Sequence, residues 1–86
     1  MYKIVLSREA EKEYIYLHRH ANSIFIRIRN AIHSIAEDPR QGKPLRLALR
    51  GKWSYRVGAY RIIYSVDGKM LIVYILDIGH RREVYK

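Results

Sequence analysis

The feature that most constrains the fold is a run of strand-forming residues at 53–76, which is interrupted by two pairs of turn-forming residues. It reads WSYRVGAYRIIYSVDGKMLIVYIL. Short segments rich in Tyr, Val and Ile predict β-strands. The pairs Gly58-Ala59 and Asp67-Gly68 are typical of two-residue hairpin turns, of type II′ and type I′ respectively. The run therefore predicts three consecutive antiparallel strands, at residues 53–57, 60–66 and 69–76.

Two-residue turns would also fix the pairing of these strands. Arg56 would lie opposite Arg61, and Arg61 would lie opposite Tyr74 on the third strand. The third strand is apolar on both faces, so we expect an interior strand that is covered on both sides. One face of the sheet would be apolar throughout and would receive the helices: Trp53, Tyr55, Val57, Tyr60, Ile62, Tyr64, Leu71, Val73 and Ile75.

The first 37 residues predict a strand followed by two helices. The strand is YKIVL at 2–6, and Ser7 suits the N-cap of a first helix that runs to about His18. A second helix, capped by Asn22 or Ser23, would end near Glu37 because the following Pro39 disfavours helical backbone. The buried stripes of the two helices would be Ala10, Tyr14 and Leu17, and then Ile24, Ile28, Ala31, Ile32 and Ile35.

Together these elements predict one α/β (α+β) domain over residues 1–86, in the order βααβββ. Only a few residues separate the helices, so they should form an antiparallel hairpin packed on a small, mainly antiparallel sheet. Residues 38–52 predict a loop, with a short helical turn at Leu45–Leu49.

Charge narrows the classes of partner. The net charge is +9, and five of the eight acidic residues precede Pro39, whereas most of the basic ones follow it. A basic domain is typical of nucleic-acid binders; the alternatives are a soluble basic protein or one neutralised by an acidic partner protein. The lack of cysteine fits the cytoplasm. No segment approaches the ~20 apolar residues of a membrane span, and we expect no signal peptide.

The opposed arginines need an explanation, because like charges directly opposed on a sheet destabilise it by up to ~1 kcal/mol. An anion bound between Arg56 and Arg61 would relieve the repulsion, and Tyr74 beside them could stack on a base. Alternatively, both arginines splay to solvent or pair with Glu83 or Asp77. The residues alone leave these alternatives open.

The C-terminal segment GHRREVYK adds His80, Arg81, Arg82 and Tyr85. Arginines stabilise charge on a phosphoryl group, and His or Tyr can transfer a proton. These groups suffice for RNA cleavage without a metal or other cofactor, through attack of the 2′-hydroxyl on its own phosphate. We expect no metal site, because the other histidines are spaced as surface residues: His18, His20 and His33.

The chain resembles the RelE/ParE superfamily of toxins, and more specifically the RelE-like mRNA interferases. The resemblance covers nearly the whole chain and is carried by EDPRQGKPLRLALRGKWSYRVGAYRIIYSV and IGHRREVY. It implies a helical hairpin on a small sheet, cleavage of mRNA in the ribosomal A site, and neutralisation by a cognate antitoxin in a hetero-oligomer. The rival functions are ParE-type poisoning of DNA gyrase and a non-catalytic module that only binds its antitoxin.

The resemblance also implies residue roles. Arg61 and Arg81 would stabilise the phosphate, and Tyr85 would orient or deprotonate the 2′-hydroxyl. His80 is a further candidate for proton transfer, and which residue is the base and which the acid stays open. The candidate RNA-binding residues are Lys43, Arg46, Arg50, Lys52, Arg56, Tyr74 and Arg82.

Overall fold

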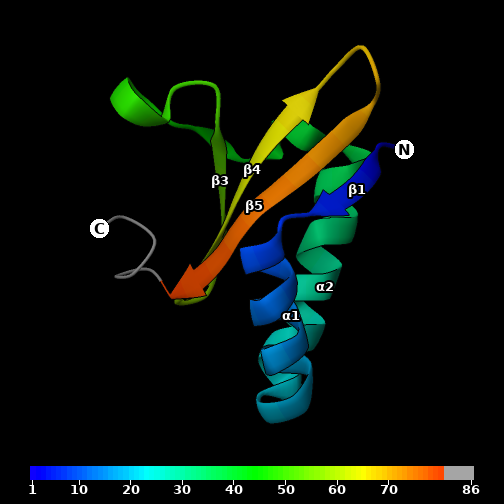
Figure 1. The fold of residues 1–86 in the computed structure, drawn as a ribbon, viewed down its shortest axis with the longest axis vertical. Helices are drawn as coiled ribbons and strands as arrows, with labels where there is room; N and C mark the ends of the chain where they lie inside the picture. Colours follow the sequence, from blue (N-terminus) through cyan, green and yellow to red (C-terminus); the bar gives the residue numbers. More distant parts are fainter. Residues whose placement is uncertain (81–86) are drawn as a thin grey trace.

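The computed structural model describes residues 1–80 and forms two layers, a helical hairpin and a five-stranded sheet (Figure 1). The sheet order is β1-β5-β4-β3-β2, with β1 parallel to β5 and every other pair antiparallel. This arrangement confirms the predicted α+β fold. The elements are β1 (Lys3–Leu6), α1 (Arg8–His20), α2 (Asn22–Glu37), η1 (Pro39–Gln41), β2 (Lys43–Pro44), η2 (Leu47–Leu49), β3 (Trp53–Val57), β4 (Tyr60–Asp67) and β5 (Ile72–His80).

The helices cover one face of the sheet, which we call the helix side; the other is the open side (Figure 1). The core lies between the layers and joins Leu17, Ile28 and Ile35 of the helices to Ile62 and other residues of the central strands. Most residues of the two predicted apolar helix stripes are buried there. Phe25, which was not part of the predicted stripes, is buried with them. No helix within residues 1–80 is long and apolar enough to cross a membrane.

Ser7 begins α1 as predicted and also ties it to the sheet. Its Oγ accepts a hydrogen bond from the Ala10 N–H (3.1 Å) and donates one to the Leu76 carbonyl (2.7 Å). The start of α2 differs from the prediction, because Ala21 rather than Asn22 or Ser23 is its N-cap. Ala21 closes α1 at the same time through its N–H to the Leu17 carbonyl, so the connection leaves no room for a side-chain cap.

The first hairpin has the predicted register. Gly58 has a positive φ (59°) and Ala59 does not, as a type II′ turn requires. Val57 therefore pairs with Tyr60, and Arg56 lies directly opposite Arg61.

The predicted register of the second hairpin was wrong, because four residues rather than two connect β4 and β5. The Asp67 carboxylate accepts hydrogen bonds from the N–H groups of Lys69 and Met70, both at 3.0 Å. These bonds stabilise a wider turn that ends at Leu71 with a positive φ (56°). Leu71 is thus 52% exposed in the turn, not buried on the helix side.

An irregularity in the β4–β5 ladder shifts the register once more. Tyr64 pairs with Ile75, whereas Ile63 pairs with Asp77, so one extra residue of β5 lies between these pairs. As a result Arg61 opposes Gly79, whereas the wider turn alone already places Tyr74 opposite Ser65. The expected contact of Tyr74 with the two arginines is therefore wrong. Tyr74 is also exposed, so β5 is an interior strand whose open side is only partly covered.

Residues 38–52 contain a two-residue strand, β2, where the sequence predicted only a loop with a short turn. A side chain on β4 anchors the chain just before it. The Tyr64 hydroxyl donates to the Pro39 carbonyl (2.7 Å) and accepts from the Gly42 N–H (3.1 Å). A side chain at position 42 would overlap that hydroxyl and approach the Ser54 carbonyl to 2.8 Å, so the contact needs glycine. Burial raises the pKa of the Tyr64 hydroxyl, which therefore stays protonated.

We expect Tyr64→Phe to lower the free energy of unfolding by about 1–3 kcal/mol, because it leaves the Pro39 carbonyl and the Gly42 N–H without their partner. Tyr74→Phe is the matched control, since it removes the hydroxyl of an exposed tyrosine and should change stability by less than about 0.5 kcal/mol. Urea unfolding followed by circular dichroism measures both. Equal losses in the two variants would contradict the anchoring role of Tyr64.

Candidate functional site

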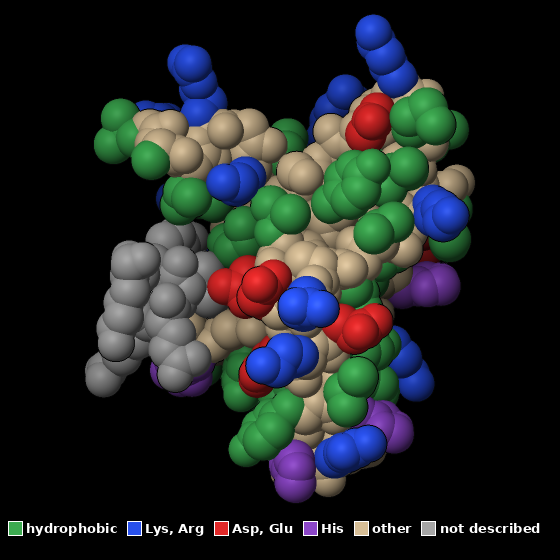
Figure 2. All heavy atoms as spheres, in the orientation of Figure 1, with side chains coloured by type: hydrophobic (Ala, Val, Ile, Leu, Met, Phe, Trp, Pro, Cys, Tyr) green, Lys and Arg blue, Asp and Glu red, His purple; other side chains and the backbone are tan. Residues whose placement is uncertain are grey.

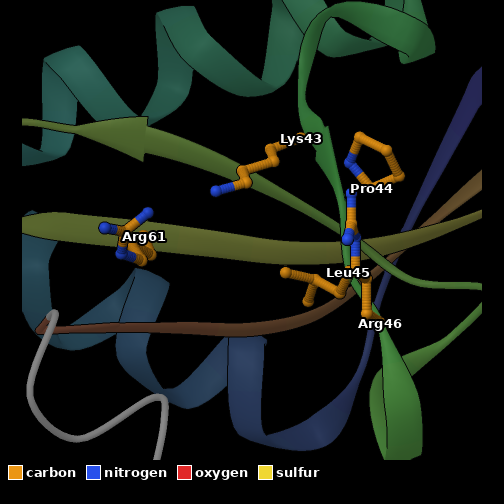
Figure 3. Close-up of a pocket in the computed structure, with 5 residues that line it drawn as sticks. All are labelled: Lys43, Pro44, Leu45, Arg46 and Arg61. Carbon is orange, nitrogen blue, oxygen red and sulfur yellow. The ribbon is translucent and has the colours of Figure 1, made fainter.

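The candidate site is a hollow of about 660 Å³ on the open side, which we call the cationic hollow (Figure 3). Three of its lining residues are basic: Lys43, Arg46 and Arg61. Pro44 and Leu45 complete the described lining. Basic groups from segments 15 or more residues apart in the sequence thus meet at one place.

Arg61 reaches the hollow from the middle of the sheet. Its neighbours across the strands are Arg56 on β3 and Gly79 on β5. Gly79 has no side chain, so the extra residue in β5 leaves space beside the Arg61 side chain on the open side. Arg61 is half-buried as a residue, and the Nε atom of its guanidinium is enclosed. A half-buried guanidinium interacts with an anion more strongly than a fully solvated one, because water screens it less.

Lys43 and Arg46 come from β2 and the segment that follows. Lys43 pairs with Ser54 of β3, and the Leu45 N–H donates to the Lys52 carbonyl (2.9 Å). Figure 3 shows the Lys43 side chain extending from β2 along the sheet toward Arg61. The segment around η2 projects from the body, and in Figure 2 it carries basic and hydrophobic side chains and shows no acidic one on this face. The backbone therefore places Lys43 and Arg46 in the lining that they share with Arg61.

The chemistry of the cationic hollow favours an anion. No acidic residue is among the described residues that line it. An arginine presents a planar fork of donors that matches two oxygens of a phosphate, and a lysine adds a mobile point charge. Within residues 1–80 no group of three His, Cys, Asp or Glu side chains is placed to hold a metal ion.

The other predicted site residues are distributed more widely. Arg56 is exposed, and its Nε donates to the Gly58 carbonyl at the hairpin turn (3.2 Å). Arg50 and Lys52 follow η2 and are not among the described lining of the cationic hollow. Tyr74 of β5 pairs with Ser65 of β4, which is four residues beyond Arg61 on that strand.

His80 pairs with Tyr60, and the two rings pack edge to face with their centroids 5.9 Å apart. Paired residues share a face, so His80 lies on the helix side, whereas Arg61 points to the open side. Arg81, Arg82 and Tyr85, which the sequence also singled out, lie outside the described residues.

One basic residue near the site was missing from the sequence-based candidates. Arg27 of α2 reaches the hairpin turn, where its guanidinium nitrogens lie 3.2 and 3.3 Å from the point that a side chain on Gly58 would occupy. In the sequence Arg27 is only a polar residue outside the apolar stripe of its helix. No local signal distinguishes it from Arg29, and only the packing of α2 against the sheet brings it there.

Sequence comparisons find toxins. Residues 4–85 match the family described as ParE toxin of type II toxin-antitoxin system, parDE. Toxin RelG of Mycobacterium tuberculosis is 40% identical over 57 residues, which span 65% of this chain and 66% of that toxin. Toxin YoeB of Synechocystis is 28% identical over 85 residues, which span 93% of this chain and 99% of that toxin.

Solved structures share the fold. A YoeB/ParE toxin from Agrobacterium tumefaciens superposes with a TM-score of 0.83 at 22% identity, over 91% of this chain and 96% of that one. A chain of the toxin-antitoxin complex RelBE2 from M. tuberculosis gives a TM-score of 0.79 at 30% identity, over 93% of this chain and 98% of that one.

We expect Lys43→Gln to weaken the binding of a labelled single-stranded DNA about five-fold at 0.1 M salt. The loss of one phosphate contact removes ~0.7 from the slope of log affinity against log salt, which extrapolates to a factor of about five between 1 M and 0.1 M. Lys69→Gln is the matched control, because Lys69 is exposed on the β4–β5 turn and does not line the hollow. Fluorescence anisotropy at several salt concentrations measures both. Equal weakening would show that net charge alone attracts the anion.

Proposed function

Because this chain belongs to the ParE toxin family of type II toxin-antitoxin systems, within the RelE/ParE superfamily, we propose that it is an endoribonuclease that cleaves mRNA in the ribosomal A site and so stops translation. The observation that carries the proposal is the cationic hollow. Its basic groups line a space on the open side of the sheet. In the proposal, a single strand of RNA binds in this space. Arg61, the residue that the family resemblance assigns to the phosphate, is one of its walls.

The proposed reaction needs no metal. The 2′-hydroxyl oxygen bonds to the adjacent phosphorus, and its proton passes to a base. The bond from phosphorus to the 5′-oxygen breaks, and that oxygen takes a proton from an acid. Negative charge builds up on the phosphate oxygens between these events. A guanidinium placed there stabilises the transition state, and removal of one such donor typically costs ~2.7–4 kcal/mol.

The roles follow the resemblance and the position of each residue. Arg61 contacts the phosphate oxygens, and Arg81, two residues after Gly79 in the sequence, joins it as a second cation. Tyr85 acts on the 2′-hydroxyl. We assign removal of the proton from the 2′-hydroxyl to Tyr85 rather than to His80, because His80 pairs with Tyr60 on the helix side of the sheet. Arg81 would then aid the leaving 5′-oxygen by donating a proton to it. Lys43 and Arg46 hold the flanking RNA backbone, with Arg50, Lys52, Arg56 and Arg82 as further contacts.

A cognate antitoxin is the expected protein partner. Two structural neighbours are toxin-antitoxin complexes, RelBE2 from M. tuberculosis and YoeB-YefM from Staphylococcus aureus. We propose that an antitoxin forms a hetero-oligomer with this chain in the cytoplasm, close to the ribosomes on which it acts. Its acidic side chains would compensate the basic groups of the open side.

We expect Arg61→Ala and Arg81→Ala each to lower the rate of mRNA cleavage about 100-fold or more, since each removes a cation from the transition state. Growth inhibition on expression without antitoxin should be lost in both. Lys69→Ala, on the exposed β4–β5 turn, is the control for charge and expression. Toeprinting on translating ribosomes measures cleavage. A fully toxic Arg61→Ala protein that still cleaves translated mRNA would refute the proposed mechanism.

Toeprinting and growth assays, together with a supercoiling assay on purified gyrase, separate the rival functions. The ParE description of the matching family supports gyrase poisoning as a second candidate. In that event the wild-type protein inhibits supercoiling by purified gyrase and leaves mRNA intact. A module that only binds its antitoxin neither inhibits supercoiling nor slows growth when it is expressed alone.

A further inference from the structure

A second, smaller hollow lies where α2 meets the β3–β4 turn. It has a volume of about 350 Å³ and we call it the turn hollow. Its polar side chains are Arg27, Asn30, Tyr55 and Arg56, and Ala31, Val57 and Gly58 complete the described lining. No acidic residue is among them. The turn hollow is therefore a second concentration of positive charge, outside the site described above.

The glycine in the turn allows the first guanidinium to approach. Arg27 lies over Gly58, with its Nη2 and Nη1 atoms 3.2 and 3.3 Å from where a side chain on Gly58 would begin. A side chain at this position would displace the guanidinium by a few tenths of an ångström, in addition to straining a backbone with φ of 59°. Asn30 follows three positions later on the same exposed face of α2 and adds an amide group to the same wall.

Arg56 is fixed to the same turn. Its Nε donates to the Gly58 carbonyl (3.2 Å), so its terminal nitrogens remain available to a ligand. β2 pairs with β3 only at Trp53 and Ser54, so at Arg56 β3 is the edge strand of the described sheet, with β4 on its inner side alone. The Arg56 side chain can thus bend around the edge of the sheet from the open side toward α2.

Arg56 connects the two hollows. It lines the turn hollow and is the direct cross-strand neighbour of Arg61, which lines the cationic hollow. Opposed residues of antiparallel strands have Cα atoms only ~4.5–5.5 Å apart. Basic side chains therefore continue from β2 across β4 and β3 to α2.

We propose that Arg27 and Arg56 form a second phosphate-binding site around Gly58, which holds RNA backbone outside the cleavage site. The existence of the site rests on the turn hollow alone, whereas its ligand class rests on the proposed function. Two planar guanidinium forks that meet at one turn suit the oxygens of a phosphodiester. An RNA chain carries a charge at every nucleotide, so a strand bound in the cationic hollow has further phosphates within reach of Arg56. The carboxylates of a protein partner have no such fixed continuity.

The test uses Arg27→Gln, with Arg29→Gln as its matched control on the same helix. Both residues are exposed and lose the same charge, but only Arg27 lines the turn hollow. The probe is a labelled single-stranded RNA with 2′-O-methyl groups, which cannot be cleaved. We expect Arg27→Gln to weaken its binding about five-fold at 0.1 M salt and to lower the salt slope by ~0.7, and Arg29→Gln to leave both unchanged. Arg27→Lys keeps the charge without the fork and should fall between them.

Two further arms identify the source of the phosphate. If Arg27→Gln weakens binding to ribosomes equally with and without mRNA, and leaves binding to the oligonucleotide unchanged, the bound backbone is ribosomal RNA. If binding to the oligonucleotide is weakened, the bound backbone is mRNA. Equal affinities of Arg27→Gln and Arg29→Gln in all assays would overturn the second site. So would a loss confined to antitoxin binding, which would assign the turn hollow to the protein partner. A wild-type protein that binds RNA without cleaving mRNA would refute the proposed function and leave the site standing.

Discussion

The buried hydroxyl of Tyr64 is the interaction on which the site depends. β2 is only two residues long, and the segment from Pro39 to Lys52 has little other attachment to the sheet. The hydroxyl bonds a carbonyl and an N–H of that segment at once, so it fixes where β2 begins. Arg61 is three residues earlier on the same strand and faces the open side. One strand therefore carries the central cation of the hollow on one face and, on the other, the group that places Lys43 beside it.

The irregular pairing of β4 and β5 serves the core and the site together. With uninterrupted pairing from Tyr64 and Ile75, Arg61 would oppose Ile78. The extra residue moves Ile78 opposite Ile62, where both are buried, and moves Gly79 opposite Arg61. Extra residues of this kind bend a strand and redirect its side chains. Here a single inserted residue keeps an isoleucine in the core and opens space around a guanidinium on the opposite face.

Local sequence patterns correctly predicted the elements that depend on interactions between neighbouring residues. The helices follow from their stripes and from Ser7, and the Arg56–Arg61 pair follows from the Gly58 turn. The predicted register of the second hairpin was wrong because the Asp67 side chain accepts hydrogen bonds from two backbone N–H groups and stabilises a longer turn. The Asp-Gly pair alone does not indicate this longer turn. β2, the shifted pairing beyond Tyr64 and the position of Arg27 depend on contacts between distant segments. For that reason the basic character of the site could be predicted, but not which cations meet.

Under the proposed function, the density of positive charge on the open side would let one surface serve both RNA and an antitoxin. Arg56 and Arg61 are directly opposed, which costs up to ~1 kcal/mol on a sheet, and Lys43 and Arg46 add to the repulsion. Any anion bound to these groups in the folded state relieves it and stabilises the protein in proportion to the logarithm of its concentration. Under the proposed function, RNA and an acidic antitoxin each relieve the same repulsion between basic groups of the free toxin. Each therefore weakens the binding of the other, because the charge that one neutralises no longer attracts the second.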